Sequence, residues 1–100
     1  MVKTMRATKK MIIVAFDISQ AKKRRQIVTM LLKYGKRINK SVFECLLTES
    51  QYKKVVVRLR MLCGKGDSVV IMPICINCYA KMEFIPPRIE ETAELVKVLS

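Results

Sequence analysis

The order of apolar and amphipathic segments predicts an α+β fold, a ferredoxin-like sandwich with the element order β-α-β-β-α-β and a short extra C-terminal strand. Two apolar runs, at residues 11–16 and 67–73, indicate strands, and two amphipathic stretches, at residues 19–34 and 48–62, indicate helices. A bent, extended segment at residues 36–47 separates the two helices. Both helices would cover one face of the sheet, which leaves the other face open for a second copy.

The first strand is predicted from six consecutive apolar residues, Met11 to Phe16, a pattern typical of a strand that is buried on both faces. Asp17, one of two aspartates in the chain, closes this run. In open α/β layers, chemistry gathers at the C-terminal ends of strands. Asp17 is therefore the first candidate for a metal-binding carboxylate, although an aspartate at this point could equally cap the turn into the first helix.

The first helix is expected to begin at Ser19 as its N-cap and to end at Gly35, which would adopt a left-handed conformation. Arg24 lies seven residues before Leu31 and therefore lines up with the apolar stripe of this helix. We expect Arg24 near the end of the first strand rather than out in solvent. The extended segment that follows alternates imperfectly, which predicts a bend near residues 39–40.

The second helix is predicted from a capping box, Thr48 to Gln51, followed by a helical apolar period that Gly64 ends. The strand at residues 67–73 comes next, and Met82 to Ile85 form the short extra strand. We expect a domain over residues 11–85, preceded by a flexible basic leader, residues 1–10. Residues 86–100 form a C-terminal extension in which residues 89–99 have a helical pattern.

The charge of the chain is strongly positive and unevenly distributed. The net charge is +12, and residues 1–65 hold 17 Lys and Arg against three acidic residues. Such an excess favours polyanions, nucleic acid first and an acidic membrane surface second. No apolar run is long enough to cross a membrane, so we expect a cytoplasmic protein. The candidate nucleic-acid-binding residues are Lys22, Lys23, Arg24, Arg25, Lys36, Arg37 and Lys40.

The four cysteines carry a weaker signal, and the chain has no histidine. Cys75 and Cys78 have the spacing of metal ligands, but Cys45 and Cys63 are isolated, so an all-cysteine zinc site is disfavoured. We expect small, buried, reduced thiols, with a redox role for the Cys75–Cys78 pair as an alternative.

Three stretches carry a family resemblance, in matching order and spacing across residues 11–85. They are Val14-Ala15-Phe16-Asp17-Ile18-Ser19 with Lys23-Arg24-Arg25, then Gly35-Lys36-Arg37-Ile38-Asn39-Lys40-Ser41-Val42-Phe43-Glu44, and then Asp67-Ser68-Val69-Val70-Ile71-Met72-Pro73 leading to Cys75 and Cys78. Together they resemble the CRISPR-associated "type 2" proteins, the small core subunit of CRISPR spacer acquisition.

The resemblance implies a two-fold homodimer in which the Asp17 residues of the two copies face each other and share one Mg²⁺ ion. It implies a metal-dependent endonuclease, with Arg24, Arg37 and Phe43 on positions tied to nuclease activity. Family members often carry tyrosine where this chain has Phe16, so any role of that hydroxyl is absent. Members differ in whether they cleave RNA, double-stranded DNA or nothing measurable.

The resemblance also implies partners. In the family, the homodimer bridges two dimers of the larger integrase subunit and holds a short double-stranded DNA for insertion into the repeat array. Two alternatives to a nuclease stay open: a non-catalytic scaffold that binds DNA through Lys and Arg, and a ferredoxin-like regulator that binds RNA. From the residues alone, Phe43 is more typical of a core or interface position than of a base-stacking one.

Overall fold

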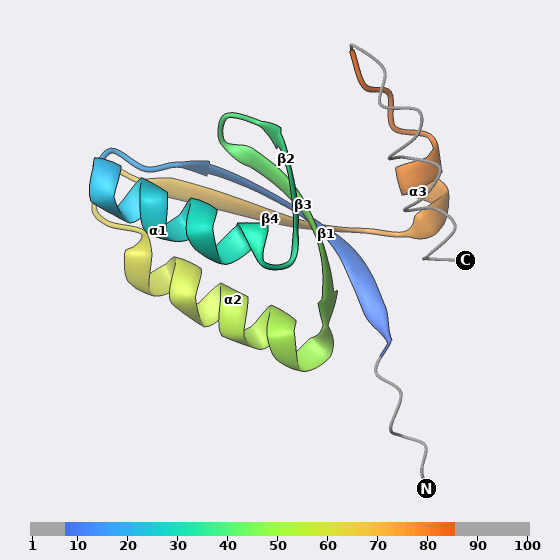
Figure 1. The fold of residues 1–100 in the computed structure, drawn as a ribbon, viewed down its shortest axis with the longest axis horizontal. Helices are drawn as coiled ribbons and strands as arrows, with labels where there is room; N and C mark the ends of the chain where they lie inside the picture. Colours follow the sequence, from blue (N-terminus) through green and yellow to red (C-terminus); the bar gives the residue numbers. More distant parts are fainter. Residues whose placement is uncertain (1–7, 86–100) are drawn as a thin grey trace, which may run out of the picture.

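The structure, a computed structural model, describes residues 8–85, and four strands and three helices follow one another along them. The elements are β1 (Lys9–Asp17), α1 (Ala21–Leu32), β2 (Gly35–Asn39), β3 (Val42–Thr48), α2 (Glu49–Leu62), β4 (Ser68–Ile74) and α3 (Ile76–Ala80). The strands form one antiparallel sheet in the order β2-β3-β1-β4. Helices α1 and α2 lie on the same side of this sheet (Figure 1). The predicted ferredoxin-like α+β fold is confirmed.

Strand β1 is central, and its alternating side chains separate the two faces of the sheet. Ile12, Val14 and Phe16 belong to the core cluster that includes residues of α1 and α2. Ala15 and Asp17 therefore lie on the opposite side, which we call the outer face. The strand begins at Lys9, two residues before the predicted start, because Lys9 and Lys10 still pair with β3.

Both predicted ends of the first helix are wrong. Gln20, not Ser19, is the N-cap of α1, and no side chain caps the helix. At the other end, the φ angle of Gly35 is not positive, and Lys33 is the C-cap in a right-handed conformation. Gly35 instead begins β2, where a Cβ atom would lie 1.8 Å from the carbonyl oxygen of Glu44. The glycine is needed for close approach of two strands rather than for helix termination.

The next segment and the second helix follow the sequence pattern closely. The predicted bend is present as a register shift between Arg37 and Asn39, where β2 pairs with β3. The capping box of α2 is confirmed, since the Thr48 side chain accepts from the Gln51 amide and the Gln51 side chain accepts from the Thr48 amide. Thr48 is both the last residue of β3 and the N-cap of α2, so the helix begins directly where the strand ends.

The outer face is partly covered, which corrects the expectation of a wholly open face. Helix α3 follows β4, and its Tyr79 is fully buried with its hydroxyl donating to the Glu44 carboxyl at 3.1 Å. No strand forms over Met82–Ile85, where a short strand was predicted. On β4, Val70 and Met72 remain exposed, at 52% and 37%. An apolar strip therefore stays uncovered in the described part of the chain.

The remaining predictions about the chain ends lie outside the described residues. These are most of the basic leader and the helical pattern at residues 89–99. Among the described helices, none is long and apolar enough to cross a membrane.

Candidate functional site

Asp17 is exposed at the C-terminal end of β1, where it pairs with Ser68 of β4. By the alternation of the strand it lies on the outer face, on the same side as Ala15 and the exposed Val70 and Met72. The carboxylate thus lies beside the uncovered apolar strip. A second copy that packed on this strip would come close to the Asp17 carboxylate.

Asp67, the other aspartate, has a structural role that was not predicted from the sequence. Its carboxylate accepts from the amide and hydroxyl of Ser19, at 2.9 and 3.1 Å, and from the amide of Gly64 at 2.8 Å. The Ser19 amide, then the Gly64 amide, lowers the pKa of Asp67 below its ordinary value. Asp67 therefore ties the loop after β1 to the loop after α2. The Gly64–Asp67 spacing suggests a turn, but nothing local indicates the bond to Ser19.

Arg24 holds the same loop from the other side. Its Nη1 donates to the carbonyl oxygens of Ile18 and Ser19, at 2.8 and 2.9 Å. The prediction that Arg24 lies near the end of the first strand is confirmed by these two bonds. The side chain is nevertheless exposed, so the prediction that it avoids solvent is wrong.

Arg37 and Phe43 lie against each other on β2 and β3. The guanidinium carbon of Arg37 is 5.5 Å from the centroid of the Phe43 ring, and its Nε and Nη2 donate to the Lys40 carbonyl at 3.1 and 2.9 Å. Phe43 is fully buried and stacks on Phe16 with 6.1 Å between ring centroids. The buried ring of Phe43 therefore packs against the guanidinium of Arg37, and Arg37 itself is exposed.

A cavity of about 580 Å³, which we call the arginine cavity, brings several predicted site residues together. Its lining residues include Arg24 and Arg25 of α1, Arg37 of β2 and Lys40 of the β2–β3 turn. Asp17 is not among its lining residues, although its neighbour Phe16 is. The strand alternation thus puts the carboxylate on one face and the arginines on the other.

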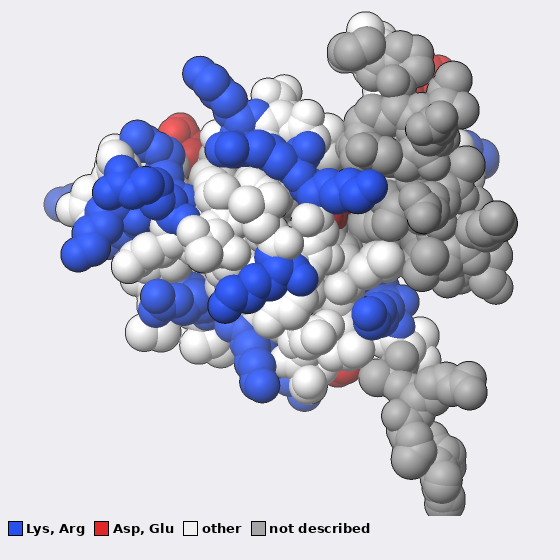
Figure 2. Space-filling view, viewed as in Figure 1, with Lys and Arg blue, Asp and Glu red and all other residues white. Residues whose placement is uncertain are grey.

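The other predicted cations do not all lie on the helical side: Lys36 pairs with Glu44, which lies opposite Ile13 of β1, so Lys36 is on the outer face. Lys22 and Lys36 are exposed, and Lys23 is half-buried close enough to Asp67 to help lower its pKa. Figure 2 shows Lys and Arg side chains spread over the face that α1 and α2 form, with acidic side chains at a few points. This face is suited to a polyanion.

The cysteines differ from the prediction of buried thiols. Cys45 is buried, and burial raises its pKa to about 12, but Cys75 and Cys78 are exposed. The Cys78 amide donates to the sulfur of Cys75 at 3.3 Å, and this bond lowers the pKa of Cys75. No three acidic or cysteine side chains of the described residues come together as a metal site. Within the described residues, one protomer therefore supplies a single candidate metal ligand at the end of β1, which is Asp17.

Comparison with known proteins identifies the family. The profile of the family described as "CRISPR associated protein Cas2" matches residues 10–82. The CRISPR-associated endoribonuclease Cas2 1 of Chloroflexus aurantiacus is 32% identical over 92 residues, which cover 87% of this chain and 97% of that protein. The CRISPR-associated endonuclease Cas2 2 of Thermus thermophilus is 36% identical over 67 residues, covering 66% of this chain and 74% of that protein.

A solved structure agrees with these sequence relatives. The crystal structure of Streptococcus pyogenes Cas2 superposes with a TM-score of 0.67 at 26% identity, covering 73% of this chain and 95% of that one. The family match spans most of the chain and includes every residue of the candidate site. The chain belongs to the Cas2 family of CRISPR-associated proteins.

Proposed function

We propose that the protein is a Mg²⁺-dependent endonuclease of CRISPR spacer acquisition, which hydrolyses phosphodiester bonds of RNA or double-stranded DNA as a homodimer. The observation that carries the proposal is the place of Asp17, exposed at the end of the central strand and beside an uncovered apolar strip. Two relatives are named as an endoribonuclease and an endonuclease, which supports the reaction class.

The uncovered strip supports the homodimer. Val70 and Met72 are exposed apolar side chains on the face of the sheet that α1 and α2 do not cover. A small domain that exposes apolar sheet surface gains stability by covering it with a second copy. A two-fold axis near the end of β1 would bring the two Asp17 carboxylates together.

The residues fit Mg²⁺ when two copies are considered. Carboxylate oxygens are ligands that Mg²⁺ prefers, and it is commonly held by one or two of them with water and substrate phosphate oxygens. Asp67 is not available as a ligand, because its two oxygens accept three hydrogen bonds within the protomer. When bound between the two Asp17 residues, the ion would activate a water molecule and neutralise charge that develops on the phosphate.

The cations of the arginine cavity bind the nucleic acid backbone rather than the reacting phosphate in this proposal. Arg24 and Arg37 line a cavity on the helical side of β1, whereas Asp17 lies on the outer face. Phe43 is buried and acts as a positioning residue for Arg37. Lys22, Lys23 and Lys40 extend the cationic surface around these arginines, whereas Lys36 lies on the outer face.

A second candidate function is a non-catalytic scaffold of the spacer-acquisition complex. The observation that favours it is the cationic face over α1 and α2, which would hold double-stranded DNA without any chemistry at Asp17 (Figure 2). Such a dimer would bridge copies of the larger integrase subunit. One dimer can perform both functions, so the two are separated by a cleavage assay.

The test uses Asp17→Asn, which removes the charge of the carboxylate and keeps its shape. Labelled double-stranded DNA and single-stranded RNA are incubated with the purified protein at low salt with Mg²⁺, and a parallel reaction contains EDTA. Glu49→Gln serves as the control, because Glu49 is an exposed carboxylate that pairs with Lys10 away from the site. Circular dichroism and size-exclusion chromatography verify the fold and the dimer of each variant.

We expect Asp17→Asn and EDTA each to reduce cleavage by about 100-fold or more, since metal-ion catalysis contributes several kcal/mol. Glu49→Gln should cleave like the wild type. Cleavage that survives Asp17→Asn would refute the assignment of the site. Absence of cleavage by the wild type would leave the scaffold as the function.

A further inference from the structure

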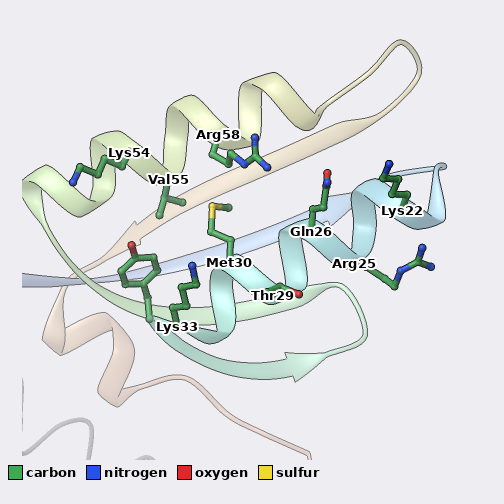
Figure 3. A pocket seen from close by; sticks show the side chains of 10 residues that line it. Lys22, Arg25, Gln26, Thr29, Met30, Lys33, Lys54, Val55 and Arg58 are labelled. Carbon is green, nitrogen blue, oxygen red and sulfur yellow. The ribbon is translucent and has the colours of Figure 1, made fainter.

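A second hollow on the helical side lies between α1 and α2, and we call it the helix groove. It has a volume of about 760 Å³ and is lined by residues of both helices and by Lys33 and Tyr34, which follow α1. Figure 3 shows Met30 and Val55 between the two helices, with Arg58 extending from α2 toward α1. The base of the groove is thus partly apolar and its rims are polar.

Five cations line the helix groove, and no acidic residue does. They are Lys22, Arg25, Lys33, Lys54 and Arg58. Within residues 8–85, none of the five forms an ion pair with a carboxylate. The groove therefore concentrates positive charge that the described part of the protein does not neutralise.

The spacing of these cations works against the stability of the helices. Lys22 and Arg25 are three residues apart on α1, and Lys54 and Arg58 are four residues apart on α2, so each pair places like charges side by side. Lys22 and Arg25 also lie in the first turns of α1, where cations oppose the helix dipole and no acidic residue compensates. A bound anion would relieve both costs.

The helix groove adjoins the arginine cavity. Arg25 and Thr29 line both hollows, because they lie on the ridge of α1 between them. The cations consequently follow one another from the β2–β3 turn, across α1, to α2. A ligand with repeated charges along its length fits such a track better than a single small anion does.

We propose that the helix groove binds the sugar–phosphate backbone of a nucleic acid strand, with Lys54 and Arg58 of α2 as contacts that extend the track beyond α1. The inference rests on the proposed function in that the ligand is nucleic acid. It adds the second helix, none of whose residues is among the candidate site residues predicted from the sequence.

An acidic peptide is a less suitable occupant of this groove. Peptides that dock as amphipathic helices need exposed apolar anchors. Val55 at the base of the groove is 2% exposed, and the strongly exposed apolar residues of α2, Val57 and Met61, do not line the groove. Met30 and Tyr34, the other apolar side chains of the groove, are half-buried among five cations, and this balance favours a phosphodiester backbone.

The test compares two double variants of the same helix. Lys54→Gln with Arg58→Gln removes two charges from the groove, whereas Lys53→Gln with Arg60→Gln removes the same charges from exposed positions that do not line it. Both double variants lose one lysine and one arginine, so their net charges are equal. Thermal unfolding followed by circular dichroism shows whether the two remain equally folded.

The readout is the dissociation constant from fluorescence anisotropy, measured between about 50 and 200 mM salt for labelled 20-mers of duplex DNA, single-stranded DNA and single-stranded RNA. We expect the groove variant to reduce the slope of log K against log salt by about 1.8 for the duplex or about 1.4 for the single strand that the groove accepts. The control variant should change the slope by less than half as much. The nucleic acid whose slope changes more in the groove variant is the one that lies in the groove.

Three results would overturn the inference, and they are distinguishable. Equal changes in the groove and control variants would show that net charge alone matters. An equal loss of affinity for polyglutamate of similar length would assign the groove to acidic peptides. If the wild type bound no nucleic acid at all, the proposed function would fail together with this inference. If the wild type bound nucleic acid and the two double variants behaved alike, the groove assignment alone would fail.

Discussion

Replacement of Gly35 by alanine tests the packing that places Arg37 over the arginine cavity. The added Cβ atom would lie 1.8 Å from the Glu44 carbonyl oxygen and 2.7 Å from the Cα atom of Cys45, both backbone atoms of β3. Contacts below 3.0 Å essentially do not occur, so the two strands must separate by about 1.2 Å at this point. Because β2 is an edge strand, it can move as a unit and carry Arg37 with it.

The expected cost of Gly35→Ala is about 3 kcal/mol, the upper end for overpacking, because backbone atoms cannot rotate out of the way. With a urea m-value of about 1.5 kcal/mol per molar, the unfolding midpoint should fall by about 2 M. The assay is urea unfolding at one fixed protein concentration, followed by circular dichroism. Affinity for nucleic acid should fall as well, since the contact of Arg37 with Phe43 would be disturbed.

Gly66→Ala is the matched control. Gly66 has a φ of +85°, but a Cβ atom there would meet nothing within 4 Å. Its expected cost is about 1 kcal/mol of backbone strain, without loss of nucleic-acid binding. The reasoning about Gly35 would be refuted if Gly35→Ala lowered the midpoint no more than Gly66→Ala does.

Further predictions concern buried and titratable groups. Tyr79→Phe should lower the free energy of unfolding by about 1 to 3 kcal/mol in denaturant titrations, because it removes a donor to the buried carboxyl of Glu44; an unchanged midpoint would contradict this. Cys75 should react with iodoacetamide near neutral pH, as mass spectrometry can follow, because its lowered pKa increases the thiolate fraction, whereas Cys45 should stay unmodified in the folded protein. The stabilisation from Asp67 is present above its ordinary pKa of 3.8 and is lost as the pH falls through its lower folded-state value. Acid unfolding of Asp67→Asn should therefore depend less steeply on pH below about 4 than that of the wild type, and parallel curves would count against the three hydrogen bonds of its carboxylate.

The elements that the sequence predicted correctly are those with a repeated local signal. Six apolar residues from Met11 define the central strand, and the capping box at Thr48 defines the start of α2, because each pattern reports interactions within a few residues. Gly35 shows the limit of this reasoning. A glycine after an amphipathic run is typical of a helix end, but here the deciding contact is with Glu44 on a neighbouring strand.

The candidate site shows the same limit. The end of β1 at Asp17 could be predicted, whereas the bonds of Ser19 to Asp67 join residues 48 positions apart and leave no local pattern. Helix α3 was missed because five residues are too few to display a helical period. Cys78 stands exposed on that helix, although its residue type favours burial, because a short surface helix can bury one side chain, Tyr79, and leave its neighbours outside.

Phe16 and Asp17 are consecutive residues on opposite faces of the sheet, and under the proposed function this separates binding from chemistry. The cations of α1 and α2 lie on the helical side with Phe16, and the reacting carboxylate lies on the outer face. Cations that contact the substrate equally before and during the reaction lower KM without raising kcat. A strand held by those cations must pass the end of β1 to reach Asp17, and the loop at that point is held by Arg24 on one side and by Asp67 on the other. Under the proposed function, the fixed loop would determine which phosphate of a bound strand comes within reach of the carboxylate.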